Sequence, residues 1–157
     1  MIKNPDLRRQ VTQINDLIAR VPAATGGDLE LQAHWARYLC VLAAGFLENA
    51  LFETYSAFVY AGASPAVASF AASRLENISN PKASRFVEIA RSFKPIWGDE
   101  LDRFLADDAR KEAIDSIMAN RHLIAHGKQS GITIARLRSF FDRAITVVEF
   151  IERQCGV

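Results

Sequence analysis

Apolar residues recur at helical spacing along nearly the whole chain. The last segment alternates between steps of three and four, with apolar positions at Ile134, Leu137, Phe141, Ala144, Val148 and Ile151. A first stripe of the same kind runs through Leu7, Val11, Ile14, Ile18 and Val21. Such spacing gathers apolar side chains on one face of a helix. Because no segment alternates apolar and polar residues with period two, the sequence predicts an all-α bundle without a sheet.

Capping residues, prolines and glycines divide this pattern into helices. Pro22 to Gly27 is expected to end the first helix, and Asp28 can cap a long second helix over residues 29–60. Ser64-Pro65 and Asn80-Pro81 each place a capping residue before a proline, which predicts the starts of a third and a fourth helix.

The second half is divided by the same kinds of residue. Pro95 to Gly98 is expected to be a connection, followed by a short helical segment. Asp107 or Asp108 can cap a further helix that stops near Gly127, and Thr133 can cap the last one. We therefore expect a bundle of four main helices plus shorter ones, forming one domain over residues 1–157.

The charge balance limits how such a bundle could bind nucleic acid. Lys and Arg number 19 and Asp and Glu number 18, so the formal net charge is +1. This excludes a basic coat as the source of affinity for RNA, which would have to come from a local cluster. The N-terminus lacks the apolar region of a signal peptide, and no stretch is typical of a membrane span. With Cys40 and Cys155 as the only cysteines, we expect a cytoplasmic protein with free thiols.

One helical segment departs from its own apolar pattern near its end. The stripe runs through Ile114, Ile117 and Met118, and Arg121 then occupies the next apolar position. An arginine on a core-facing stripe must find a partner or line a cavity, because burying an unpaired charge is costly. This is where we expect the functional site.

The two histidines that follow admit several interpretations. His126, just before Gly127, can bond the free carbonyls of the helix end. His122 and His126 are one turn apart and can face one metal ion, but no HExxH motif or nearby carboxylate supports a metal site. The third interpretation pairs Arg121 with His126 as an R-x4-H motif. Five residues differ by about 140° around a helix axis, so either the helix loosens at Gly127 or a second copy of the chain completes the site.

The run Arg121-His122-Leu123-Ile124-Ala125-His126-Gly127 resembles the signature of HEPN domains, in which an arginine is followed by a polar residue and, a few residues later, by a histidine. The long helix from Tyr38 to Glu48 resembles the early core helix of stand-alone HEPN proteins, and the chain is similar to the RiboL-PSP-HEPN group. The resemblance implies a HEPN-like helical bundle and a homodimer in which two motifs face each other. It also implies an endoribonuclease that needs no metal or other cofactor.

The resemblance gives the site residues expected roles. His126 would act as general base or acid, and Arg121 would donate hydrogen bonds to the phosphorane oxygens. His122 and Asn120 would orient the phosphate or position His126. Attack of a 2′-hydroxyl on the adjacent phosphate would leave a 2′,3′-cyclic phosphate and a 5′-hydroxyl.

Other charged residues admit two interpretations each. Glu48 is the only charge between Arg37 and Glu53, and it can pair with any nearby arginine or hold Arg121 in the site. Lys128 can contact RNA phosphate or be a solvated lysine. The basic fourth helix can contact phosphate or be a solvated face; its cations are Lys82, Arg85, Arg91 and Lys94. His34, beside Trp35, is expected to be structural.

Three functions follow from these observations. The first is a ribonuclease in a toxin–antitoxin or anti-phage defence setting, with RNA as substrate and an antitoxin or regulatory protein as a possible partner; this setting comes from the resemblance alone. The second is a non-catalytic HEPN module that binds RNA, a nucleotide or a protein partner. The third is a helical scaffold in which the motif is a coincidence.

Overall fold

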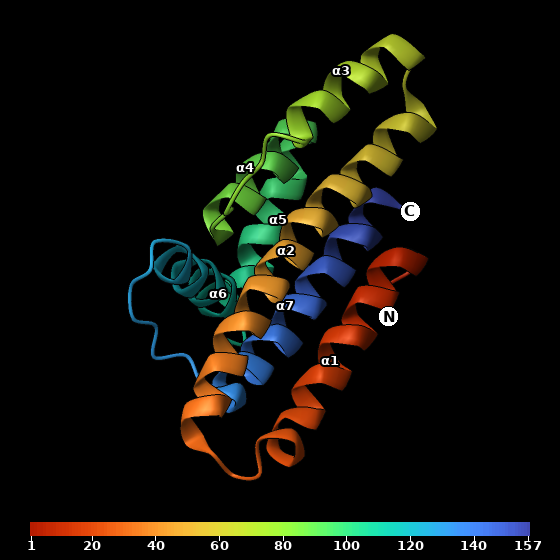
Figure 1. The fold of residues 1–157 in the computed structure, drawn as a ribbon. Helices are drawn as coiled ribbons and strands as arrows, with labels where there is room; N and C mark the ends of the chain where they lie inside the picture. Colours follow the sequence, from red (N-terminus) through yellow and green to blue (C-terminus); the bar gives the residue numbers. More distant parts are fainter.

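The computed structural model describes residues 1–157 as seven helices and no strands, which confirms the all-α prediction (Figure 1). The helices are α1 (Pro5–Thr25), α2 (Leu29–Gly62), α3 (Pro65–Leu75), α4 (Ala83–Phe93), α5 (Pro95–Ala106), α6 (Arg110–Ala125) and α7 (Ile134–Cys155). None of them combines the length and the apolar character that a bilayer crossing requires.

The long helix α2 forms the axis of the bundle. It packs against α1, α7, α6 and α3, and α1, α2 and α7 run side by side (Figure 1). In the core, Phe46 of α2 meets Phe141 of α7 edge to face, with ring centroids 5.4 Å apart. Tyr55 stacks on Phe93 of α4 at 4.9 Å. Ala43 and Ala44 of α2 are buried in the same core.

Several predicted helix starts are confirmed. Asp28 Oδ1 accepts hydrogen bonds from Glu30 N and Leu31 N, at 2.9 and 3.0 Å, and so caps α2. Thr133 Oγ1 accepts one from Arg136 N and caps α7. Pro65 occupies the first turn of α3 as expected, although the Ser64 side chain makes no capping bond. Proline suits that position because its missing N–H would be unpaired there anyway.

One predicted boundary in the first half is confirmed and one is wrong. α1 continues through Pro22 and ends at Thr25, within the predicted stretch Pro22 to Gly27. The Thr25 hydroxyl is buried and donates to Val21 O, so packing and this bond outweigh the one backbone bond that Pro22 removes. The fourth helix begins at Ala83 rather than at Asn80-Pro81, and Asn80 has a left-handed φ of 49°.

Two predicted boundaries in the second half are also wrong. Pro95 to Gly98 is not a connection but the first turn of α5, again with proline at the start. Neither Asp107 nor Asp108 caps α6, whose N-cap is Ala109 in the left-handed conformation. The two carboxylates bind arginines instead.

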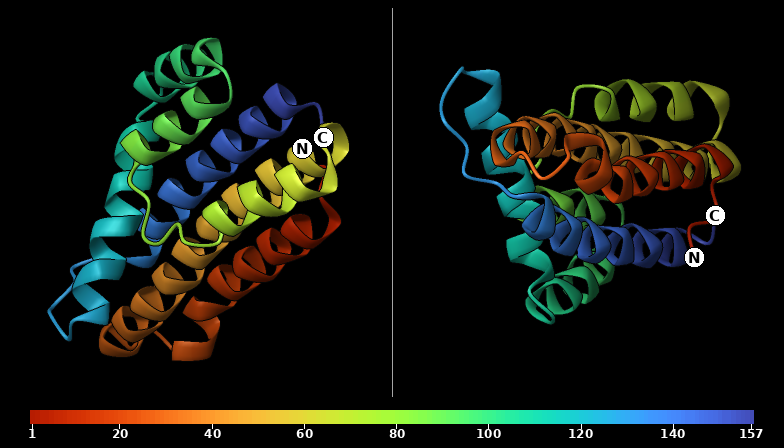
Figure 2. Two further views of the ribbon diagram at one scale, coloured as in Figure 1. Left: turned by 90° about the horizontal axis from the view of Figure 1, so that it is seen from above. Right: turned by 60° about the horizontal axis from the view of Figure 1, so that its bottom comes forward.

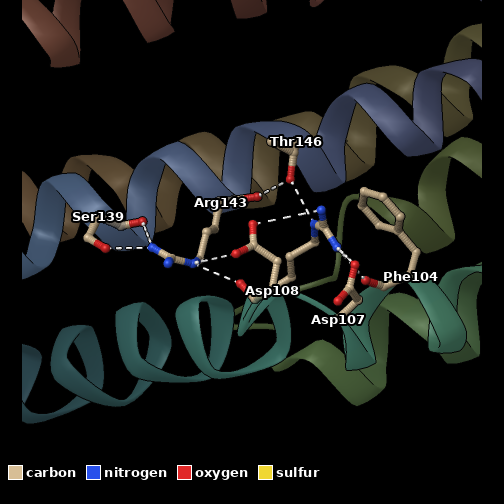
Figure 3. A network of polar contacts seen from close by, with 7 residues as sticks. Phe104, Asp107, Asp108, Ser139, Arg143 and Thr146 are labelled. Carbon is tan, nitrogen blue, oxygen red and sulfur yellow. Dashed lines mark hydrogen bonds and ion pairs between the residues drawn. The ribbon is translucent and has the colours of Figure 1, made fainter.

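These arginines anchor the N-terminal end of α6 to α7 (Figure 3). Arg110 stacks on the Phe104 ring, 4.0 Å from its centroid, and donates to Thr146 Oγ1 and Phe104 O. It also bonds Asp107 Oδ2 at 3.3 Å. Arg143 donates to the Asp108 carbonyl at 2.8 Å. Because each guanidinium joins the α5–α6 turn to α7, the start of α6 is held in place.

Candidate active site

The C-terminal end of α6 lies beside the N-terminal part of α2, as both views in Figure 2 show. The two helices cross, and contacts of α6 with its neighbours fix its position. In the first third of α2, Cys40 Sγ lies 3.5 Å from Ile117 O of α6. Nearer the start of α6, Asp115 Oδ1 accepts a hydrogen bond from Ala83 N, the first residue of α4. The site residues therefore gather where α6 ends against the first third of α2.

The end of α6 is closed as predicted at Gly127. Gly127 has a left-handed φ of 66°, and its N–H donates to Ile124 O at 3.1 Å. Lys128 N–H donates to Leu123 O at 2.9 Å. These two bonds form a Schellman motif, in which glycine is favoured because it adopts positive φ without strain. The helix end that carries the histidines is thus a defined turn.

Arg121 sits at the edge of the buried stripe of α6 and is partly buried. Ile117 and Met118, the preceding stripe residues, are fully buried. No hydrogen bond or ion pair is formed by the Arg121 guanidinium, although its backbone N–H lies against the Cys40 thiol of α2. A partly buried guanidinium with all five donors free is suited to an incoming anion.

The expected ion pair between Glu48 and Arg121 does not form in this chain. Glu48 is partly buried on α2, and its Oε1 accepts a hydrogen bond from Asn80 N at 2.5 Å. Its carboxylate thus binds the turn that precedes α4, where the left-handed Asn80 leaves an N–H to be satisfied. Neither expected partner, Arg121 or another nearby arginine, is observed, because the carboxylate binds a backbone N–H instead.

His122 and His126 lie on one exposed face of α6. Their rings meet edge to face with centroids 4.4 Å apart. The His126 backbone leaves the helix, with φ −96° and ψ 15°, but its N–H still donates to His122 O. Loosening of the helix therefore does not swing His126 round to Arg121, and the two groups keep different faces. No third His, Cys, Asp or Glu joins the pair in a group that could hold a metal ion.

A comparison with known protein families identifies the family of this chain. A family model described as RiboL-PSP-HEPN matches residues 5–156. The chain belongs to the RiboL-PSP-HEPN family. Searches of curated proteins and of solved structures gave no match. The resemblance inferred from the Arg121–Gly127 run is confirmed, and HEPN membership indicates a nuclease-like or RNA-related role.

Asn120 of the HEPN motif segment faces away from the histidines. Its Nδ2 donates to Ser116 O at 2.8 Å, and its Oδ1 accepts from the Ser130 hydroxyl at 2.7 Å. Ser130 Oγ in turn accepts from Ile132 N at 3.4 Å. Asn120 thus fastens the loop that follows the motif and carries the exposed Lys128. These bonds hold the loop and do not involve His126, which Asn120 was expected to position.

The basic residues of the α4 region are engaged with their own neighbours. Arg85 pairs with Glu88 at 2.9 Å and Arg91 with Asp99 at 2.6 Å. Lys94 lies over the Trp97 ring, 4.4 Å from its centroid. With its arginines neutralised, this segment fits a solvated face rather than a phosphate-binding one.

Sequence reasoning missed one arginine near the site of this HEPN chain. Arg37 of α2 is half-buried, and its Nε is inaccessible to solvent and has no hydrogen-bond partner. Arg37 lies about three helical turns before Glu48, on the same face of α2. The signal that singled out Arg121, a cation on a face that packs inward, was present here as well.

Neither thiol is a candidate nucleophile. Burial raises the pKa of Cys40 to about 12, against a smaller lowering by the Arg121 backbone N–H. Burial also raises the pKa of Cys155 to about 12, with opposing smaller effects of Lys94 and Glu152. Since the thiolate is the reactive form, both cysteines are unreactive at neutral pH, which leaves the arginine and the histidines as the reactive groups of the site.

Proposed function

We propose that this HEPN chain is a metal-independent endoribonuclease whose site contains Arg121 and His126. The observation that carries the proposal is the Arg121 guanidinium: partly buried, free of any acidic partner, and next to two exposed histidines at one helix end. Such a pair of groups suits phosphodiester cleavage, which needs stabilisation of negative charge and transfer of protons.

The proposed reaction balances with these groups alone. One histidine accepts the proton of the 2′-hydroxyl as the 2′-oxygen forms a bond to the adjacent phosphorus. The bond from phosphorus to the 5′-oxygen breaks, and a second histidine donates a proton to that leaving oxygen. Arg121 donates hydrogen bonds to the non-bridging oxygens, where negative charge accumulates. The products are a 2′,3′-cyclic phosphate and a 5′-hydroxyl.

The two functional groups require a second copy of the chain. Within one copy, Arg121 and His126 occupy different faces of α6, about 140° apart. A homodimer with a two-fold axis near this end of α6 would place the arginine of each copy opposite the histidine of the other. His122 and Lys128 would line the same cleft, with Lys128 against the RNA backbone.

An exposed apolar face near the N-terminal end of α2 is the surface we assign to this second copy. Leu31, Tyr38 and Val41 are 47%, 53% and 40% exposed, and Leu31, Trp35 and Tyr38 line a hollow with His34. Exposed large apolar side chains gathered on one helix face are typical of association surfaces. Tyr38→Glu is expected to convert a dimer to a monomer in sedimentation velocity and to abolish cleavage; a dimer that survives this change would place the interface elsewhere.

Cleavage in the presence of EDTA tests the proposal directly. Purified wild type, His126→Ala and Lys111→Ala are incubated with a mixed RNA pool, and the 3′ ends of the fragments are mapped. We expect wild type and Lys111→Ala to leave cyclic phosphate ends and His126→Ala to leave the RNA intact. Lys111 is the control because it is an exposed side chain at the opposite end of the same helix. Equal cleavage by His126→Ala would contradict the assignment.

The second candidate function is a non-catalytic HEPN module that binds RNA, a nucleotide or a protein. It predicts binding without turnover by a folded dimer. A defence role as a cytoplasmic toxin, with an antitoxin or regulator as partner, is a further proposal that rests on the family. It predicts that expression of wild type, but not of His126→Ala, arrests growth.

A further inference from the structure

Arg37 is a cation that the proposed cleavage does not use, and the fold does not use it either. Its Nε is buried without an acceptor, and its guanidinium joins no ion pair. Arginine is rarely left in this state, because a buried donor without a partner loses the hydrogen bonds that water would provide. An arginine that gains no partner inside the chain is therefore expected to gain one from outside it.

The placement of Arg37 directs it toward the end of α6. Cys40, one turn further along α2, contacts Ile117 O and the Arg121 backbone N–H. Residues three apart on a helix share a face, so Arg37 and Cys40 look toward the same neighbour. α6 crosses α2 at a steep angle near the N-terminal part of α2 (Figure 2), and the contacts of Cys40 place the crossing at Ile117 and Arg121. Arg37, one turn before Cys40, therefore lies near the α6 residues around Arg121.

Neither arginine is paired with a carboxylate of the chain. Glu48 of α2 and Asp115 of α6 accept hydrogen bonds from the backbone between α3 and α4. Glu30, two turns before Arg37 on the same face of α2, is exposed and forms no ion pair with it. Both guanidiniums therefore remain free to bind an anion, in a molecule of net charge +1.

We propose that Arg37 and Arg121 together bind one phosphodiester group of the RNA backbone. Guanidinium groups bind phosphate through planar, paired N–H donors. Because Nε of Arg37 is inaccessible to solvent, its Nη groups would make this contact. Arg121 would contact the phosphate that reacts, and Arg37 would hold the same group from the α2 side. The choice of RNA as the source of the phosphate rests on the proposed function; the two-arginine anion site does not.

Binding of a non-cleavable RNA tests the site apart from catalysis. A fluorescent 2′-O-methyl oligoribonucleotide has no free 2′-hydroxyl and stays intact, so its affinity can be measured by anisotropy at several salt concentrations. We compare wild type with Arg37→Gln and Arg37→Lys. Arg103→Gln is the matched control. Arg103 is an exposed arginine of α5 that forms no hydrogen bond or ion pair, and α5 precedes the N-terminal end of α6, remote from Arg121.

We expect Arg37→Gln to weaken binding about tenfold and to reduce the salt slope by about one unit, as loss of one phosphate contact does. Arg37→Lys should recover only part of the affinity, because lysine keeps the charge but lacks the paired Nη donors of the guanidinium. In cleavage assays, Arg37→Gln should raise KM more than it lowers kcat. Arg103→Gln should change the affinity less than twofold.

Three results would overturn the proposal. Affinity of Arg37→Gln equal to that of Arg103→Gln would show that Arg37 touches no phosphate. Full recovery by Arg37→Lys would show that charge alone matters. Dissociation of the Arg37→Gln dimer in sedimentation velocity would show that Arg37 pairs with a carboxylate of the second copy. A different result would contradict the proposed function alone. If wild type binds RNA through Arg37 but never cleaves it, the chain is not a ribonuclease, but the phosphate site of Arg37 and Arg121 is still supported.

Discussion

The two ends of α6 carry the same residue type in opposite circumstances. At the N-terminal end, Arg110 bonds Thr146, Phe104 O and Asp107 and stacks on the Phe104 ring (Figure 3). At the C-terminal end, Arg121 has no acceptor at all. One end is saturated with hydrogen bonds, and the other is left open.

The difference separates arginines that hold the fold from arginines that are available for binding. Arg110 is only 14% exposed, and its partners belong to the chain itself, so its interactions contribute to the free energy of folding. Arg121 contributes no such bonds, so the fold gains little from its guanidinium. Natural proteins keep such unsatisfied groups where function requires them and offset the cost elsewhere. Replacing Arg121 should therefore reduce cleavage more than stability, and replacing Arg110 should reduce stability more than cleavage.

The largest effect is expected at the open end. Arg121→Met keeps the apolar stem of the side chain but removes every donor. We expect RNA cleavage to fall by about 10²–10³-fold, as when one donor to a developing oxyanion is removed. The free energy of unfolding should change by less than about 1 kcal/mol. Single-turnover cleavage and urea unfolding of the same preparation measure both quantities. A large loss of stability with normal cleavage would show that Arg121 serves the fold and not the reaction.

The next largest effect is expected at the saturated end. Arg110→Met should lower the free energy of unfolding by about 2–3 kcal/mol, because the charge-assisted hydrogen bonds and the contact with the Phe104 ring are lost. The fraction that remains folded should cleave RNA at the rate of wild type. Arg9→Met is the control: its ion pair with Asp6 has side chains 78% and 73% exposed, and its loss should cost less than about 0.5 kcal/mol. Equal stability of Arg110→Met and Arg9→Met would show that the bonds of Arg110 do not stabilise the fold.

The sequence predicts the fold and the motif well, and the interactions between helices poorly. Apolar spacing and local caps such as Asp28 and Thr133 identify helices, because these signals depend on residues a few positions apart. The start of α4 escaped prediction because its backbone is satisfied by Glu48 and Asp115, which are distant in sequence.

The candidate site shows the same limit. The Arg121 anomaly was visible because the residue interrupts a local stripe. Its pairing with Glu48 could not be tested from the sequence, because one carboxylate has many possible partners and the backbone of Asn80 is not visible as a competitor. Arg37 shares the local signal of Arg121, a cation on an inward-packing face, but its lack of a partner depends on the surrounding helices and is not visible in the sequence.

A smaller effect is expected at the turn that ends α6. Gly127→Ala should lower the free energy of unfolding by about 1 kcal/mol, because a φ of 66° is strained for any residue with a Cβ. No atom lies within 4 Å of the added Cβ, so backbone strain is the whole cost. Gly62→Ala is the control, since Gly62 ends α2 without positive φ and also has open space around it. Urea unfolding should show a loss for the first variant and none for the second.

The smallest effect concerns the contact that joins α2 to the open end of α6. The Cys40 thiol has its pKa raised by burial from 9.0 to about 12. In the unfolded chain the thiol ionises first, so the folded state binds more protons between these values and stability falls as pH rises. At pH 9.5 this thiol should remove about 0.8 kcal/mol relative to neutral pH. Urea unfolding at pH 7.5 and 9.5 should show a shallower decline for Cys40→Ala than for wild type. Cys155, raised to the same value, is retained in both proteins, so its contribution cancels. Parallel declines would mean that the thiol is hydrated in solution and that the α2–α6 contact opens at the end where Arg121 lies.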